Sequence, residues 1–100
     1  MDKAFVIQTL KRHEAELRGL GVERLSIFGS TARDEATDAS DVDLAVLLTP
    51  GPRGFARLER KDRIKKRLAK ILRRRVDMIE EPSSSLRVQQ EIDRDRILAF

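Results

Sequence analysis

Apolar positions recur along the chain with two different periods, which predict helices and strands in alternation. Helical spacing marks three long stretches and one short turn: residues 3–18, 55–72, 86–98 and, for the turn, 30–34. Short, largely apolar runs predict three strands: residues 22–28, 41–48 and 75–79. Pro50 and Pro52 end the second strand because proline cannot continue a hydrogen-bonded ladder.

These elements predict an α/β (α+β) fold of order α-β-α-β-α-β-α, with a mixed three-stranded sheet and about four helices. The pair Gly29-Ser30 ends the first strand, whereas Asp41 and Asp43 open the second. The two features meet at one end of the sheet only if these strands are antiparallel. A right-handed crossover through the long helix then makes the third strand parallel to the second, which brings Asp77 beside Asp43.

The composition is that of a single small domain over residues 1–100 with an aliphatic core, since 40% of residues are hydrophobic and the only aromatics are four Phe. The chain contains no cysteine, which excludes disulfides and thiolate metal sites. No apolar run is long enough for a membrane span, and no signal peptide is evident. We therefore expect a cytoplasmic protein without a membrane partner.

The net charge of +4 conceals two segments of opposite sign. Residues 34–43 contain five acidic residues and no basic one. Residues 53–75 contain twelve Lys or Arg against only Glu59 and Asp62. The acidic segment and the basic helix therefore form separate surfaces with separate roles.

Three aspartates lie where the predicted strands are otherwise apolar. Asp41 and Asp43 are two residues apart, so they share one face of a strand, where two carboxylates tolerate each other best around a cation. Asp77 interrupts a third apolar run, and a buried carboxylate is costly without a partner or a metal. Alone, the Asp-x-Asp pattern is typical of solvated surface. Together, the three positions favour a Mg²⁺ site built from hard oxygen ligands.

The residues before the Asp-x-Asp pattern complete a candidate nucleotide site. A glycine at a strand end lets the backbone approach a ligand, and Gly29-Ser30 therefore suits phosphate, although such a pair alone indicates an ordinary turn. Arg33 has two interpretations. It contacts phosphate, or it forms a structural ion pair with Asp34, Asp38 or another nearby acid.

Two further positions stay open on the sequence alone. Ser40 is placed to brace either the backbone or the Asp41 carboxylate through its hydroxyl. Glu80 and Glu81 follow the third strand, and whether either joins the site depends on where that strand ends.

The sequence resembles the DNA polymerase β-type nucleotidyltransferases at the positions just described. Gly29-Ser30, Arg33, the Ser-Asp-Val-Asp-Leu run at 40–44 and the Arg-Val-Asp run at 75–77 look like the signature of this superfamily. More narrowly they resemble the minimal nucleotidyltransferase (MNT) domains, which are antitoxin partners of HEPN-domain toxins. The resemblance covers nearly the whole chain. One departure is Asp34, where members of the family often carry Gly.

The resemblance implies a catalytic site for nucleotidyl transfer from ATP. Asp41 and Asp43 are expected to hold Mg²⁺ bridging the triphosphate, while Gly29 and Ser30 cradle its outer phosphates. Arg33 and Ser40 complete the expected nucleotide-binding set. Asp77 is expected to help bind a second Mg²⁺ and to act as general base. The implied partner is a HEPN ribonuclease toxin in a hetero-oligomer, and the implied reaction transfers AMP to a tyrosine near the active site of that toxin.

Two other functions remain open at this point. The protein is an antitoxin that neutralises its partner by covering it, or it is a nucleic-acid-binding module that contacts RNA through the basic helix 53–75. No aromatic residues are interleaved with most of these cations, so base stacking lacks a platform. The chain has no room for a separate domain that recognises base or acceptor, which favours a protein acceptor that brings its own surface.

Overall fold

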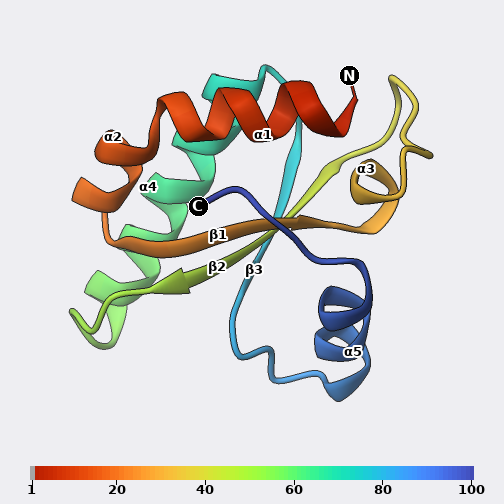
Figure 1. The fold of residues 1–100 in the computed structure, drawn as a ribbon. Coiled ribbons are helices and arrows are strands. Elements are labelled where there is room, and N and C mark those ends of the chain that lie inside the picture. The colour runs from red at the N-terminus through yellow and green to blue at the C-terminus, as the bar shows by residue number, and fades with distance from the viewer. Residues whose placement is uncertain (1) are drawn as a thin grey trace.

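The computed structural model describes residues 2–100 as one four-stranded sheet with helices on both faces (Figure 1). The elements follow in chain order: α1 (Lys3–Arg12), α2 (Glu14–Gly19), β1 (Val22–Phe28), α3 (Gly29–Ala32), β2 (Val42–Leu48), α4 (Phe55–Leu72), β3 (Val76–Glu80), α5 (Leu86–Asp95) and β4 (Ile97–Leu98). The mixed α+β class expected from the sequence is therefore confirmed, with one strand and one helix more than predicted.

The sheet has the order β3-β2-β1-β4. Strand β2 is antiparallel to β1 and parallel to β3, as the sequence predicted. In this register Asp43 lies opposite Phe28 on one side and opposite Asp77 on the other. The strand directions thus bring the end of β1 and the starts of β2 and β3 together at one end of the sheet.

The last residues of the chain form a strand where the sequence predicted helix. Helix α5 ends at Asp95 instead of continuing to Leu98, and Arg96 adopts an extended conformation with φ −49° and ψ 128°. Ile97 and Leu98 then pair with β1 in antiparallel fashion. The edge of β1 offers backbone partners that a further helical turn would leave unused, and this long-range pairing overrides the local helical pattern.

The first predicted helix, residues 3–18, is divided into α1 and α2 at His13. The backbone N–H of His13 donates to Leu10 O at 3.1 Å, which tightens the last turn of α1, and the His13 Nδ1 atom lies 2.9 Å from Thr9 O. His13 therefore caps α1 and redirects the chain. Asp2 caps the start of α1, because its Oδ1 atom accepts a hydrogen bond from Phe5 N at 2.8 Å.

Alternation along the strands divides the core into two parts, with α5 on the opposite side of the sheet from α1 (Figure 1). The larger part joins the sheet to α1, α2 and α4 through fully buried side chains such as Leu10, Leu17, Ile64 and Leu68. The smaller part joins it to α5 through Phe28, Ala45 and Ile92, with Ile79 and Val88 packed at its margin.

Within residues 2–100, no helix has both the length and the apolar character required to cross a membrane. The long helix α4 spans 18 residues, but its solvent-facing side is dense with charged side chains.

The small core under α5 yields a stability prediction. Ile92 is completely buried between α5 and the sheet, so Ile92→Ala leaves a cavity and should lower the free energy of unfolding by about 2–4 kcal/mol. Leu86, on the same helix, is 73% exposed, and Leu86→Ala should change it by less than about 0.5 kcal/mol. Urea denaturation of the two variants measures the difference. Equal losses would show that α5 is not anchored through Ile92.

Candidate functional site

The site is organised around the close approach of Gly29 to Asp43. Gly29 follows the last residue of β1 and opens the short helix α3 with φ +70°. A Cβ atom at this position would overlap Asp43 Oδ2, so the Asp43 carboxylate occupies the space that any other side chain would need. Only glycine combines this left-handed backbone with so close a contact.

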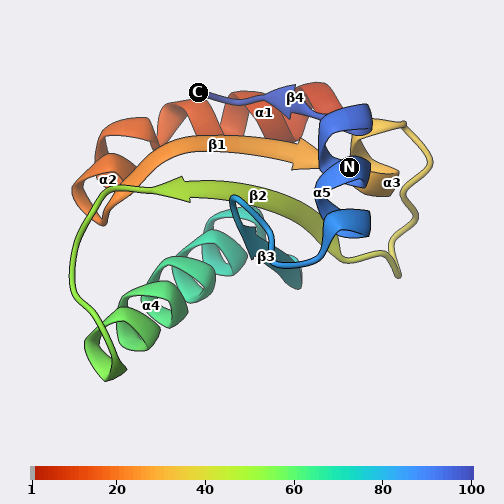
Figure 2. The same cartoon turned by 90° about the horizontal axis from the view of Figure 1, so that it is seen from below.

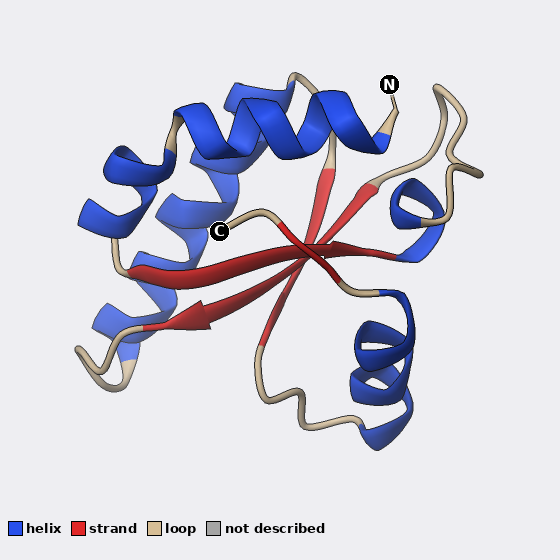
Figure 3. Cartoon of the chain, viewed as in Figure 1, coloured by secondary structure: helices blue, strands red, loops and turns tan. Residues whose placement is uncertain are grey.

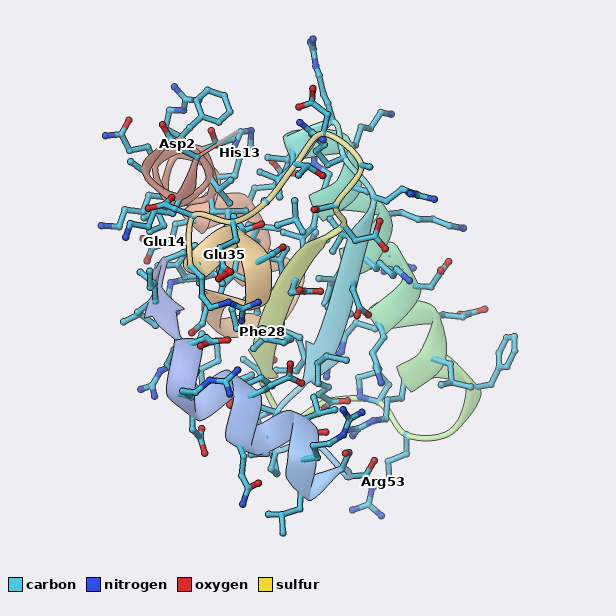
Figure 4. All side chains as sticks on the ribbon, turned by 90° about the vertical axis from the view of Figure 1, so that its right-hand side faces the viewer. Asp2, His13, Glu14, Phe28, Glu35 and Arg53 are labelled. Atoms are coloured by element: carbon cyan, nitrogen blue, oxygen red, sulfur yellow. The ribbon has the colours of Figure 1, made fainter. Side chains whose placement is uncertain are left out.

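Three carboxylates gather around this contact at the end of the sheet. Asp43 is half-buried on β2, and Asp77 is its exposed register partner on β3. Asp41 is exposed immediately before β2, although the sequence placed the start of the strand at this residue. Figure 4 is viewed toward this end of the molecule, and it labels Phe28 at the end of β1 and Glu35 in the loop beyond α3.

The surroundings of Asp43 disfavour its charged form. Burial is the largest cause, the carboxylates of Asp77 and Asp41 follow, and Glu91 adds to them, so that together they raise the pKa of Asp43 to about 6 despite an opposing contribution from Arg33. A cation at this position would remove the repulsion and stabilise the ionised form. The donors are hard carboxylate oxygens, which fit Mg²⁺ in kind.

Asp41 forms an ion pair with Arg75, whose Nε atom lies 3.2 Å from Asp41 Oδ1. Within residues 2–100, no three acidic, His or Cys side chains already converge closely enough to hold a metal ion. Binding of one metal ion by all three aspartates would therefore require their side chains to move closer together than they lie here. The Arg75 side chain is 81% exposed, and so solvated an ion pair exchanges its partner at little cost.

Arg33 is engaged by acids of its own chain. Its Nε atom donates to Glu35 at 2.7 Å and its Nη1 atom donates to the nearly buried Asp95 of α5 at 2.6 Å. The acids that the sequence suggested have other partners, since Asp34 pairs with Lys3 and Asp38 with Arg74. Arg33 thus ties α3 to α5, and its contact with phosphate stays a prediction.

The loop between α3 and β2 projects from this end of the sheet (Figure 3). Asp34 begins it with φ +57°, the left-handed conformation that favours glycine and that aspartate tolerates better than most residues. Ser40 Oγ accepts a hydrogen bond from Thr37 N at 3.0 Å, so its hydroxyl braces the backbone of the loop. A role of Ser40 in nucleotide binding stays a prediction.

Glu80 and Glu81 lie away from the three aspartates. Glu80 is opposite Val46 in the register of β2 and β3 and pairs with Arg57 and Lys61 of α4. Glu81 receives hydrogen bonds from Arg96. Both glutamates therefore form structural ion pairs in this fold.

Glu91 is a fourth carboxylate near Asp43, and it was not predicted from the sequence. Glu91 precedes the buried Ile92 and lies one turn before Asp95, on the side of α5 that faces α3. Glu91 and Asp95 are one helical turn apart and therefore lie on one side of a helix. This spacing indicates a place near the site only when the packing of Ile92 shows which side of α5 meets the sheet.

The sequence and the fold were compared with known proteins. The family model for the nucleotidyltransferase domain matches residues 9–98. No curated protein matches the sequence. A solved structure assigned as a minimal nucleotidyltransferase is 31% identical, with a TM-score of 0.70 over 97% of this chain and 95% of that chain.

Two toxin–antitoxin structures are also similar. One contains AMP-PNP, is 24% identical and has a TM-score of 0.68 over 90% of this chain and 72% of that chain. The other is the tri-AMPylated HEPN toxin of Shewanella oneidensis in complex with an MNT antitoxin, at 23% identity and a TM-score of 0.62 over 94% of this chain and 71% of that chain. At these identities the likeness shows a shared fold.

The contact between Gly29 and Asp43 predicts a position-specific effect of added bulk. Gly29→Ala combines a left-handed backbone with the overlap on Asp43, so it should lower the free energy of unfolding by about 1–2 kcal/mol. Gly19→Ala is the matched control because open space surrounds this helical glycine, and its effect should stay below about 0.5 kcal/mol. Urea denaturation distinguishes them, and equal stability would contradict the contact.

The raised pKa of Asp43 predicts a pH-dependent stability in the absence of metal. Folding favours the protonated carboxyl, so this stabilisation is complete below about pH 3.8 and is lost as the pH rises through about 6. Asp43→Asn cannot ionise, and at pH 8 in EDTA it should be more stable than the parent by about 1 kcal/mol after allowance for solvent screening, or about 5 °C in Tm.

Below pH 4 this gain should vanish, because the parent then carries a neutral carboxyl as well. Glu23→Gln removes the same charge from an exposed position on β1 and serves as the control. Thermal melts of the three proteins between pH 4 and pH 8 test the prediction. A gain that does not depend on pH would show that repulsion among carboxylates is not its cause.

Proposed function

The chain belongs to the nucleotidyltransferase domain family, and from this premise we propose that it is a Mg²⁺-dependent protein adenylyltransferase that transfers AMP from ATP to a hydroxyl of a partner protein. The observation that carries the proposal is the set of three aspartates around Gly29, with Asp43 and Asp77 in register and Asp41 two residues away. The acceptor we favour is a tyrosine of a HEPN-type toxin, which makes the chain an antitoxin within a hetero-oligomer.

In this proposal each site residue has a defined role. Mg²⁺ bound by Asp41, Asp43 and Asp77 supplies positive charge at the entering and leaving oxygens. Gly29 and Ser30 leave room for the outer phosphates beside Asp43, where a larger side chain would intrude. Asp77 is exposed on the edge strand β3, within reach of an acceptor that approaches from solvent.

Asp77 takes the proton of the acceptor hydroxyl as that oxygen attacks the α-phosphorus of ATP. A bond forms between the acceptor oxygen and the α-phosphorus, while the bond from the α-phosphorus to the bridging oxygen of the β-phosphate breaks. Pyrophosphate leaves, and the acceptor keeps AMP as a phosphodiester. Arg33 borders this space, held by Glu35 and Asp95, and partly offsets the negative charge at Asp43.

The similarity of the fold to two toxin–antitoxin structures supports a protein acceptor. The MNT antitoxin of Shewanella oneidensis is described in complex with a tri-AMPylated HEPN toxin, and a second toxin–antitoxin structure is described with AMP-PNP. A structure assigned as a minimal nucleotidyltransferase covers 97% of this chain with 95% of its own, so the two share one fold over nearly their whole extent. In this proposal the acceptor docks on that shared fold.

The basic helix is less suited to nucleic acid than its composition suggests. Many of its cations are paired within the chain, including Arg57 and Lys61 with Glu80, and Arg67 with Glu16. These pairs must open before the cations can neutralise phosphates, which reduces the gain from such binding. Nucleic-acid binding is therefore the weaker alternative.

The proposal predicts transfer of label from α-labelled ATP to the partner. The protein co-purified with the product of its neighbouring gene should, with α-labelled ATP and Mg²⁺, add AMP to that partner, detected as label and as an increase in intact mass. Asp43→Asn should lower the rate at least about a hundredfold because it removes a central ligand of the metal. The exposed Glu23→Gln carries the same change in charge and should keep the parental rate.

EDTA should abolish transfer by the parent. If the intact complex yields no label with any variant, steric neutralisation replaces transfer as the function. In that case a triple variant with Asn at positions 41, 43 and 77 would still protect cells from the toxin. If that variant fails to protect while it still binds the toxin, steric neutralisation is excluded.

A further inference from the structure

One side of α4 carries exposed apolar side chains at its start and exposed cations nearer its end. Phe55 is 75% exposed and Leu58 is 61% exposed. Lys65, Lys66 and Ala69 follow on the same side, because residues three, four, seven and eleven positions apart share a helical face. The first turns of α4 extend beyond the sheet, which leaves the apolar pair accessible (Figure 2).

The basic end of this side of α4 opens on the candidate catalytic site. A groove of about 390 Å³ lies between α4 and the starts of β2 and β3. Its charged lining consists of Lys65, Lys66 and Arg75, together with Asp41 and Asp62. An occupant of the groove would therefore lie directly against Asp41, one of the three aspartates of the site.

The cations of the groove are available to a ligand. Lys65 has no ion-pair partner within the part of the chain that the structure describes. Lys66 pairs with Asp62 at 2.8 Å, but both side chains are more than half exposed. Arg75 pairs with Asp41, but its side chain is 81% exposed, so the pair can open to a ligand at little cost. In contrast, Arg67 is engaged by Glu16 on the other side of the helix.

We propose that the face formed by Phe55, Leu58, Lys65, Lys66 and Arg75, the acceptor face, binds a segment of the acceptor protein that has acidic residues beside the modified hydroxyl and an apolar residue farther away. The inference rests on the proposed function and deepens it, since it names the substrate class. The acidic residues meet the lysines and Arg75, and the apolar residue covers Leu58 and Phe55.

The helix fixes the spacing of such a segment. Leu58 and Lys65 are seven positions apart, or about 10 Å along the axis, which an extended peptide spans in about three residues. The hydroxyl-bearing residue lies next to the acidic pair, on the side away from the apolar residue, because Asp41 lines the groove together with the lysines. The pattern is apolar, about three residues, two acids, then the acceptor residue.

The chemistry of this face favours a peptide over nucleic acid. A nucleic acid presents a phosphate at every nucleotide and needs cations along its whole path. Here Leu58 and Phe55 occupy one end, and the acidic Glu59 and Asp62 lie between the apolar end and the lysines. Only a ligand with separate apolar and acidic parts uses both ends.

Titration of the ¹⁵N-labelled protein, followed by amide NMR shifts, tests the proposal without catalysis. The probe is acetyl-Leu-Leu-Gln-Gln-Gln-Glu-Glu-Tyr-amide, and its counterpart carries Lys-Lys in place of Glu-Glu. The acidic peptide should shift amides within residues 55–69 and 75–77. The Lys-Lys peptide should bind at least tenfold more weakly.

Two double variants distinguish binding in the groove from a general effect of the net charge of the protein. Lys65→Glu/Lys66→Glu should weaken binding of the acidic peptide at least tenfold. Arg63→Glu/Lys70→Glu changes the net charge equally on the same helix, outside the groove, and should stay within twofold of the parent. Phe55→Ser/Leu58→Ser should weaken binding severalfold, which reports on the apolar end.

Three results would overturn the proposal: shifts confined to other surfaces, equal losses in both charge variants, or shifts of the acceptor face by the RNA r(U)₁₂ without any by the acidic peptide. The titration contains no ATP, so it is independent of the labelling experiment. Peptide binding without transfer of label would reject the proposed function alone. Transfer of label without peptide binding would reject the acceptor face alone.

Discussion

The rest of the site depends on the contact in which the Gly29 backbone leaves room for the Asp43 carboxylate. This contact exists because β1 ends where β2 begins, which only an antiparallel pair allows. The parallel strand β3 then adds Asp77 to the same place. The result is a concentration of negative charge that opposes folding, as the raised pKa of Asp43 indicates. The large core between the sheet and α1, α2 and α4 offsets this cost, a common arrangement in which a functional site is stabilised by the packing around it.

Helix α5 closes the site from the other side, and two different interactions fix it there. Ile92 anchors the helix through burial against Phe28 and Ala45. The ion pair of Arg33 with Asp95 then joins α5 to α3 across 62 residues of sequence. Burial of Ile92 sets the rotation of the helix and the charged pair holds its end against α3, so Glu91 comes to face Asp43. A change in α5 therefore alters the electrostatics of the site without touching an aspartate.

The parts of this arrangement that depend on short-range patterns were predictable from the sequence. Asp41 and Asp43 share a face because of the strand period, and the handedness of crossover connections brings Asp77 beside Asp43. The division of the first helix at His13 was missed because Leu10 and Leu17 keep helical spacing across it, although the hydrogen bonds of His13 to Thr9 and Leu10 are local. The strand at Ile97 was missed because it depends on a backbone partner chosen by the tertiary fold. The role of Glu91 was hidden for the same reason, since the rotation of α5 follows from packing. An ion pair of Arg33 with a nearby acid was among the interpretations, and Glu35 provides it, whereas Asp95 was beyond the pattern because it lies in a distant helix.

The separation of charge along the sequence has a consequence for how substrates reach this site. A triphosphate approaching Gly29 and an acidic segment approaching Asp41 both meet three carboxylates, so each needs positive charge of its own. Bound Mg²⁺ would neutralise charge on the triphosphate. Charge on the acidic acceptor segment would be neutralised by Lys65, Lys66 and Arg75 on the opposite flank of Asp41. Under the proposed function, a cation bound at Asp41 would compete with Arg75 for that carboxylate and would free Arg75 for the basic groove. The same carboxylate would then link the two flanks, and a loaded donor site would favour arrival of the acceptor.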